Sequence, residues 1–219
     1  LYAIDMQSVR NGGTPSARLL IDSAAMEDQA AFAPDGRTLA FVSTASGNAD
    51  VYSIPFSPEA TQSLDAARDL TNHPGGDFRP DFSPDGERIA FTSDRDTPVY
   101  GHPIFSFTRQ REGEIYVMSR DGADAHRLTT SVDWDGSPEW SADGRTIYFY
   151  SARPRGIVGP PTSPILGQEG GFRIWVMNAD GSNPRAVTPE GVEALAPAVT
   201  ADGRIAYGKR TGYARWSIE

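Results

Sequence analysis

Residues 79–92 read Arg-Pro-Asp-Phe-Ser-Pro-Asp-Gly-Glu-Arg-Ile-Ala-Phe-Thr. Asp85-Gly86 stands just before the alternating apolar run that ends in Ile89-Ala90-Phe91. Asp-Gly is a preferred two-residue hairpin turn, because both central residues of that turn need a positive φ. The stretch therefore predicts two antiparallel strands joined by a tight turn at Asp85-Gly86.

The same pattern occurs four times along the chain. The aspartates of the four Asp-Gly pairs are Asp35, Asp85, Asp143 and Asp202, spaced by 50, 58 and 59 residues. Each pair is followed by a short apolar run, at residues 39–41, 89–91, 147–149 and 205–207. Self-similarity at such a period marks solenoids, propellers or arrays.

A second hairpin follows the first in each full copy. Residues 115–118 lead through Asp121-Gly122 to residues 126–129, and residues 174–177 lead through Asp180-Gly181 to residues 185–188. Four antiparallel strands per period match one blade of a β-propeller. We therefore predict an all-β fold of four-stranded antiparallel blades, with about four blade repeats. A β-sandwich would leave the strict repeat unexplained.

Both ends of the chain carry partial repeats. Residues 1–4 and 18–20, with Asn11-Gly12 between them, match the last two strands of a blade, and residues 215–218 match a third strand. Either the ends complete one blade and close a small ring, or the chain is a segment of a larger propeller; we favour the segment. The expected divisions of this single domain are residues 1–27, 28–76, 77–134, 135–192 and 193–219.

These motifs resemble the TolB-like propeller repeat, a relative of the WD repeat. Its typical form is an aromatic residue before Ser-Pro-Asp-Gly, then Ile-Ala-Phe, Ile-Tyr-x-Met, Asp-Gly and Leu-Thr. The resemblance is strongest over residues 79–92 and 115–129 and extends over nearly the whole chain. It implies a periplasmic or otherwise extracytoplasmic bacterial protein with cell-envelope partners. Similar blades also precede peptidase and amidohydrolase domains, so a propeller domain of a larger hydrolase is the alternative.

Composition narrows the range of partners. The formal net charge is −9, so the broad basic surface that neutralises nucleic-acid phosphates is not expected. No apolar run approaches the roughly 20 residues that span a bilayer. The absence of cysteine excludes disulfides, thiolate nucleophiles and cysteine-ligated metals.

Two long connections are the expected binding region. Residues 94–113 and 152–171 join the second and third strands of neighbouring blades, where the first full copy uses only residues 44–49. Strand direction places both on one end of the blades, opposite the Asp-Gly turns. Aromatic and arginine side chains are enriched at protein interfaces. The expected partner-binding residues are Tyr100, His102, Phe105, Phe107, Arg109, Arg153 and Arg155. Alternatively, the apolar residues pack these loops onto their own blades while the arginines stay solvated.

Catalysis and metal binding find little support in the sequence. The chain has no Gly-x-Ser-x-Gly motif, and the aspartates of the Asp-Gly pairs suit turns. The three histidines are His73, His102 and His126, and they show no short metal-ligand spacing. We therefore expect no enzyme activity, no metal and no cofactor, but a scaffold that binds a protein or peptide.

Overall fold

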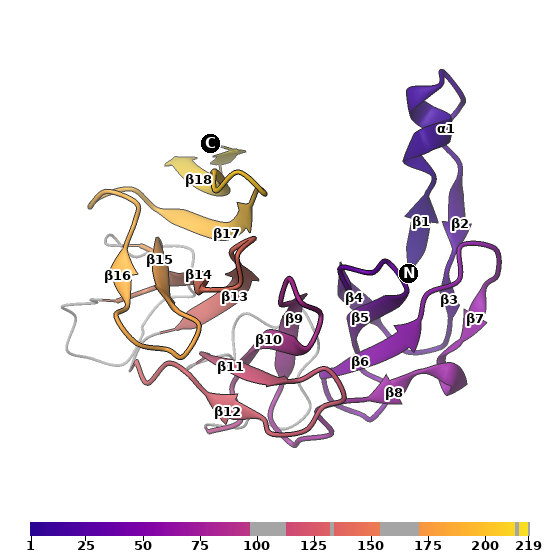
Figure 1. The fold of residues 1–219 in the computed structure, drawn as a ribbon, viewed down its shortest axis with the longest axis horizontal. Helices are drawn as coiled ribbons and strands as arrows, with labels where there is room; N and C mark the ends of the chain where they lie inside the picture. The colour runs from indigo at the N-terminus through magenta and orange to yellow at the C-terminus, as the bar shows by residue number, and fades with distance from the viewer. Residues whose placement is uncertain (97–112, 132–133, 154–170, 213–214, 219) are drawn as a thin grey trace.

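The computed structural model describes residues 1–96, 113–131, 134–153, 171–212 and 215–218. Three four-stranded antiparallel sheets follow one another around an open arc (Figure 1). The fold is all-β and consistent with a segment of a β-propeller, which confirms the predicted fold class at this level.

Each complete sheet contains four strands in chain order. The first contains β4 (Glu27–Phe32), β5 (Thr38–Ser43), β6 (Asp50–Pro55) and β8 (Arg68–Asp69). The second contains β9 (Asp77–Phe82), β10 (Arg88–Ser93), β11 (Glu114–Ser119) and β12 (His126–Arg127). The third contains β13 (Asp135–Trp140), β14 (Thr146–Ser151), β15 (Arg173–Asn178) and β16 (Arg185–Ala186). The first strand of each sheet lies on the inner side of the arc (Figure 1).

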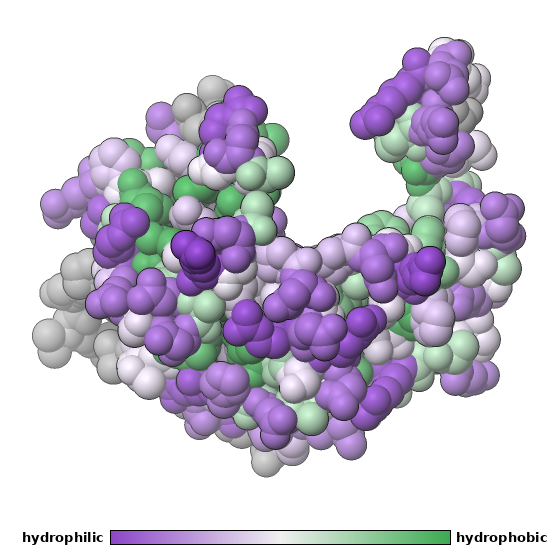
Figure 2. All heavy atoms as spheres, viewed as in Figure 1, coloured by the Kyte–Doolittle hydropathy of each residue, from purple (hydrophilic) through white to green (hydrophobic). Residues whose placement is uncertain are grey.

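Smaller sheets stand at the two ends of the arc. The strands β1 (Tyr2–Ile4) and β2 (Ala17–Leu19) form a hairpin with the short helix α1 (Met6–Arg10) at its tip. A three-stranded sheet contains β17 (Ala194–Val199), β18 (Ile205–Gly212) and β19 (Arg215–Ile218). These two ends lie apart, and a hollow separates them (Figures 1 and 2).

A strap that the sequence did not indicate fastens the hairpin to the first sheet. In the connection between β6 and β8, β7 (Gln62–Ser63) and a 3-10 helix (Leu64–Ala66) precede β8, and β7 pairs in parallel with β3 (Ile21–Asp22). The side chain of Arg18 donates to the carbonyl oxygen of Ser57 at 3.0 Å. These contacts anchor the base of the protruding hairpin.

The Asp-Gly turns differ from the predicted two-residue geometry. In the second sheet, Gly86 donates its N–H to the carbonyl of Ser83 at 2.8 Å, which closes a four-residue turn with Pro84 in its second position. Of the Asp85-Gly86 pair, only the glycine has a positive φ, of 72°. Proline fixes a negative φ and favours a type I turn, so the turn begins before the aspartate. The two-residue prediction was wrong, and proline is not the whole reason, because the turn at Gly144 has Ala142 in that position and closes in the same way, with the N–H of Gly144 donating to the carbonyl of Ser141 at 2.9 Å. The predicted turn at Asn11-Gly12 is likewise preceded by helix α1.

The hydrophobic cores lie between neighbouring sheets. Phe91 and Tyr116 of the second sheet pack with Ala40, Val51 and Leu70 of the first. The third sheet repeats this pattern, with large side chains that contact the small aliphatic residues of the second sheet. Each sheet therefore presents a bulky face to the preceding sheet and a small-residue face to the following one.

The hairpin leaves its bulky face uncovered. Tyr2 and Ile4 are 69% and 49% exposed, whereas Tyr52 and Ile54, at the same positions of the next repeat, are 8% and 1% exposed. Burial of such side chains contributes about 25 cal/mol per Å² of apolar surface. The hairpin thus lacks the stabilisation that the complete sheets gain from a preceding neighbour.

Candidate functional site

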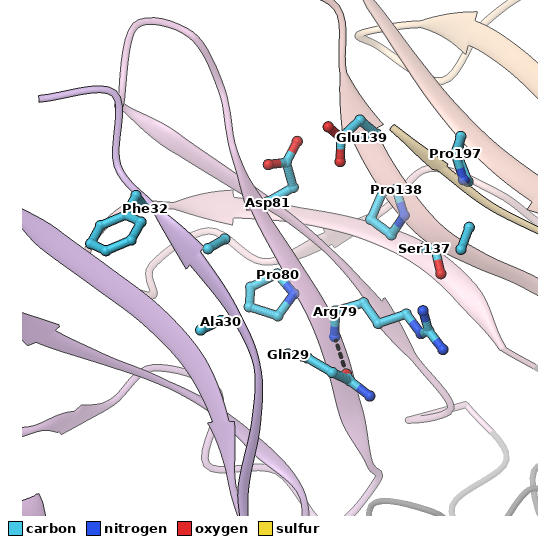
Figure 3. A pocket seen from close by; sticks show the side chains of 12 residues that line it. Gln29, Ala30, Phe32, Arg79, Pro80, Asp81, Ser137, Pro138, Glu139 and Pro197 are labelled. Atoms are coloured by element: carbon cyan, nitrogen blue, oxygen red, sulfur yellow. Dashed lines mark hydrogen bonds between the residues drawn. The ribbon is translucent and has the colours of Figure 1, made fainter. Parts of the chain in front are cut away.

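The inner strands of four sheets line a recess, whose side chains Figure 3 shows. Its volume is about 410 Å³, and residues of β4, β9, β13 and β17 surround it. A bulge interrupts each strand at the same position of the repeat. The bulged residues with left-handed φ are Gln29, Arg79, Ser137 and Ala196, with values of 54°, 53°, 50° and 49°. Bulges at the rim of a sheet redirect side chains and end regular pairing.

Side chains of the preceding sheet satisfy the backbone N–H groups on this inner edge. Arg79 donates its N–H to the side-chain oxygen of Gln29 at 2.8 Å. Ser137 donates its backbone N–H to the hydroxyl of Thr92 at 3.0 Å. Trp140 donates its backbone N–H to the carboxylate of Asp81 at 2.7 Å. Satisfied edges resist pairing with other chains, so these contacts protect the inner wall and join neighbouring sheets.

Two carboxyl groups of the recess have raised pKa values. Burial, and secondarily the charge of Glu139, raises the pKa of Asp81 to about 7. Burial also raises the pKa of Glu139. Arg79 supplies a positive charge to the same lining. The recess is therefore a polar groove with proton-binding groups, and no local motif in the sequence marks it.

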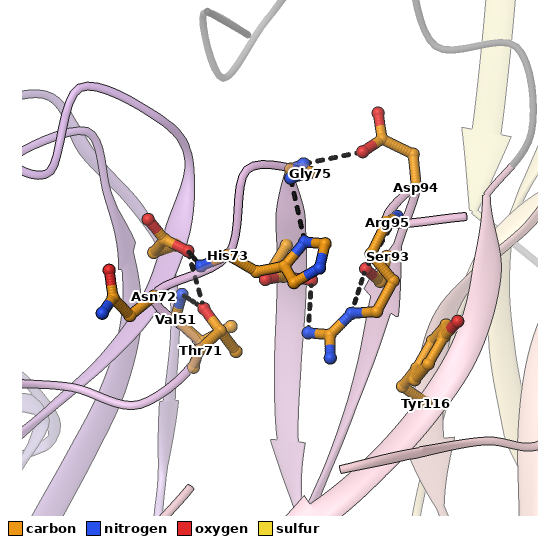
Figure 4. Close-up of polar contacts among 12 residues, drawn as sticks. Val51, Thr71, Asn72, His73, Gly75, Ser93, Asp94, Arg95 and Tyr116 are labelled. Atoms are coloured by element: carbon orange, nitrogen blue, oxygen red, sulfur yellow. Dashed lines mark hydrogen bonds and ion pairs between the residues drawn. The ribbon is translucent and has the colours of Figure 1, made fainter. Parts of the chain in front are cut away.

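The loop face is the end of the blades that carries residues 94–113 and 152–171. Three consecutive residues anchor the start of the first loop, and Figure 4 shows the first two, Asp94 and Arg95. The carboxylate of Asp94 accepts the N–H of Gly76 at 2.6 Å, and the guanidinium of Arg95 pairs with Asp77 at 3.0 Å. The hydroxyl of Tyr116 donates to Asp96 at 2.6 Å. The loop thus begins on a firmly held base.

Arg127 joins the two ends of this first loop. Its guanidinium contacts Asp96 at 2.6 Å near the start of the loop and Glu114 at 2.5 Å just after the loop ends. Thr129 donates its hydroxyl to Glu114 at 2.5 Å. Burial raises the pKa of Glu114 to about 7, although Arg127 and Thr129 oppose the shift. This network fixes where the chain leaves and re-enters the blade.

Arg153 anchors the second loop in the way that Arg95 anchors the first. Its guanidinium pairs with Asp135 at 2.5 Å and lies 4.9 Å from the ring centroid of Trp175. The side chain is only 21% exposed. Asp77 and Asp135 each precede their arginine by 18 residues, a regular spacing that could have indicated the pairs from the sequence. The described contacts of Arg153 are therefore with its own blade.

The other expected binding residues cannot be placed. Tyr100, His102, Phe105, Phe107, Arg109 and Arg155 lie outside the described residues. Their role, and that of Arg153 toward a partner, stays a prediction.

The two described histidines make local contacts. His73 donates its backbone N–H to Asp50 at 3.1 Å, and its Nδ1 accepts the N–H of Gly75 at 3.0 Å (Figure 4). Burial and the nearby Arg95 lower the pKa of His73. His126 is exposed, with Nδ1 2.9 Å from the carbonyl oxygen of Asp124. Within the described ranges, no cluster of three or more histidine, aspartate or glutamate residues could hold a metal ion.

Comparison with known proteins identifies the repeat. No family model matches the chain. The chain is 33% identical over 110 residues to the Tol-Pal system protein TolB of Anaeromyxobacter dehalogenans strain 2CP-1. That alignment covers 50% of this chain but only 20% of the relative. The chain carries TolB-like β-propeller repeats.

Solved structures with TolB-like and related blades share the fold. A putative TolB from Agrobacterium tumefaciens superposes with a TM-score of 0.67 at 23% identity, covering 90% of this chain and 60% of that one. A puromycin-hydrolyzing peptidase of Mycobacterium tuberculosis gives a TM-score of 0.62 at 20% identity, covering 94% and 31% respectively. At these identities, the structures establish only the shared fold.

Proposed function

We propose that this TolB-like chain is a non-catalytic scaffold that binds a protein or peptide partner through the loop face. The main support for this proposal is that Arg127 joins both ends of the first loop, through Asp96 and Glu114. Loops held on a rigid scaffold are common binding elements, because little ordering of their base is required on binding.

The partner belongs to the bacterial cell envelope in this proposal. Similarity to a Tol-Pal system protein supports an extracytoplasmic setting. Among the described residues, none of the helices has the length and apolar character required to cross a bilayer. The net charge of −9 argues against nucleic acid as a partner. We further propose that the chain is part of a larger propeller, since it covers 60% of the Agrobacterium structure.

A second candidate is a propeller domain within a larger hydrolase. The similarity to a puromycin-hydrolyzing peptidase supports it, because the aligned part covers only 31% of that enzyme. Both proposals expect a native protein larger than 23.7 kDa, so size alone does not separate them. Cleavage of amide substrates by the native protein, captured with an antibody to the chain, would favour the hydrolase, and its absence would favour the scaffold.

The test of the loop face compares two loop variants with a control at the other end of the blade. Phe105→Ala and Phe107→Ala should weaken capture of envelope proteins, since truncation of a central aromatic costs about 2 kcal/mol or more. Glu87→Ala is the control, because Glu87 is exposed beside the Asp85-Gly86 turn. Circular dichroism should first confirm that each variant folds. Full affinity in both loop variants, with loss in the control, would place the binding site on the opposite end.

A further inference from the structure

The second and third sheets meet at a carboxylate on the inner wall. Asp81 lies on β9, and its Oδ2 accepts the backbone N–H of Trp140 on β13 at 2.7 Å. This N–H belongs to an inner-edge strand. Its acceptor comes from the neighbouring sheet, so separation of the two sheets at the inner wall would break this bond.

A second carboxylate, that of Glu139, lines the same recess as Asp81. Glu139 directly precedes Trp140 on β13, lines the recess with Asp81, and accepts the N–H of Val199 on β17 at 3.4 Å (Figure 3). Asp81 and Glu139 interact electrostatically, and two like charges in a partly buried site repel.

Few other charges act on this pair. Among the described residues that line the recess, Arg79 on β9 is the remaining charged side chain. The lining residues from β4 include Gln29 and Phe32, and those from β17 are Ala196 and Pro197, all uncharged. A proton on one of the two carboxyl groups would remove the repulsion without breaking the bond to Trp140, because a neutral carboxyl still accepts through its carbonyl oxygen.

We propose that Asp81 and Glu139 form a proton-linked clamp between the second and third sheets. At acidic pH the pair holds one proton while the inner wall is closed. Separation of the sheets exposes both groups to water, and the proton passes to solvent.

The direction of the pH effect follows from the closed state. Burial and the neighbouring Glu139 raise the pKa of Asp81 to about 7, above its ordinary value of 3.8. The closed clamp therefore binds a proton that the open clamp releases between about pH 4 and pH 7. Opening should become up to about tenfold more favourable for each unit of pH rise in this window, and level off above it.

Hydrogen exchange of the Trp140 amide tests the clamp in the full chain. After correction for the intrinsic exchange rate, the opening constant should rise between pH 5 and pH 7. Asp81→Asn removes one titrating group of the pair while its amide oxygen still accepts from Trp140, so the pH dependence should weaken clearly and protection should remain. Asp143→Asn is the control, since Asp143 is an exposed turn residue and should leave the dependence unchanged.

A second measurement covers the case in which Asp81→Asn does not fold. Carboxyl carbon NMR should show Asp81 titrating near neutral pH in the unmodified chain, and Glu139→Gln should move that titration toward the ordinary range. The proposal is overturned if Asp81 titrates normally in the unmodified chain, or if Asp81→Asn keeps the full pH dependence at Trp140.

Discussion

The guanidinium of Arg153 lies 2.5 Å from the carboxylate of Asp135, which is completely buried at the start of β13. The pair joins the start of the second long loop, just beyond β14, to the start of the neighbouring strand β13. The same geometry joins Arg95 to Asp77 in the preceding sheet. Because the same ion pair recurs in two neighbouring sheets, we infer that it stabilises the base of each long loop.

Removal of Arg153 should destabilise the chain. Arg153→Ala leaves Asp135 buried without its cation, and loss of one partner of a buried pair costs about 3 kcal/mol or more. Arg153→Lys should recover part of the loss, because the charge remains while the planar contact with Trp175 is lost. Urea unfolding measures both. Arg145→Ala, at an exposed residue beside the Asp143-Gly144 turn, should change stability little. Equal stability of Arg153→Ala and Arg145→Ala would refute a structural role for the pair.

The chain should be more stable in mild acid than at alkaline pH. Burial raises the pKa of Asp77 and Asp94 to about 6 and that of Glu114 to about 7. A carboxyl group with a raised pKa in the folded state binds its proton more tightly there than in the unfolded chain. Its contribution to stability is therefore lost as the pH rises from about 4 to about 7. The urea midpoint should be higher at pH 5 than at pH 8, and the reverse order would contradict these assignments.

The exposed face of the hairpin should promote self-association. Tyr2 and Ile4 are largely exposed there, whereas their counterparts in the next repeat are buried. Exposed apolar patches of this kind favour association. Sedimentation should show association that grows with concentration, and the double variant Tyr2→Ser with Ile4→Ser should reduce it.

A matched control uses an apolar residue away from the hairpin. Met26 is 45% exposed just before β4, so Met26→Ser should leave the association unchanged. A compact monomer of the unmodified chain at high concentration would show that this face does not promote association.

Strand order was accessible from the sequence, whereas several connections were not. Alternating apolar residues after each Asp-Gly pair predicted β5, β10, β14 and β18, because side chains of a strand alternate between two faces. The strap at β7 escaped prediction, since two-residue parallel strands leave no periodic pattern. For the candidate site, the regular spacing of Asp77 and Asp135 from Arg95 and Arg153 was visible in the sequence, but only their contact shows that they pair.

The sequence by itself determined that four repeats of antiparallel strands form, because local turns and alternation depend on neighbours along the chain. Only the tertiary structure decided which side chains accept hydrogen bonds from the backbone N–H groups of the inner strands. Asp81 and Trp140 are 59 residues apart, and no local rule connects them. Their contact arises because sheets packed side by side bring one strand's carboxylate to the next strand's open N–H. For the same reason, the raised pKa of Asp81 depends on the packing of several sheets around it.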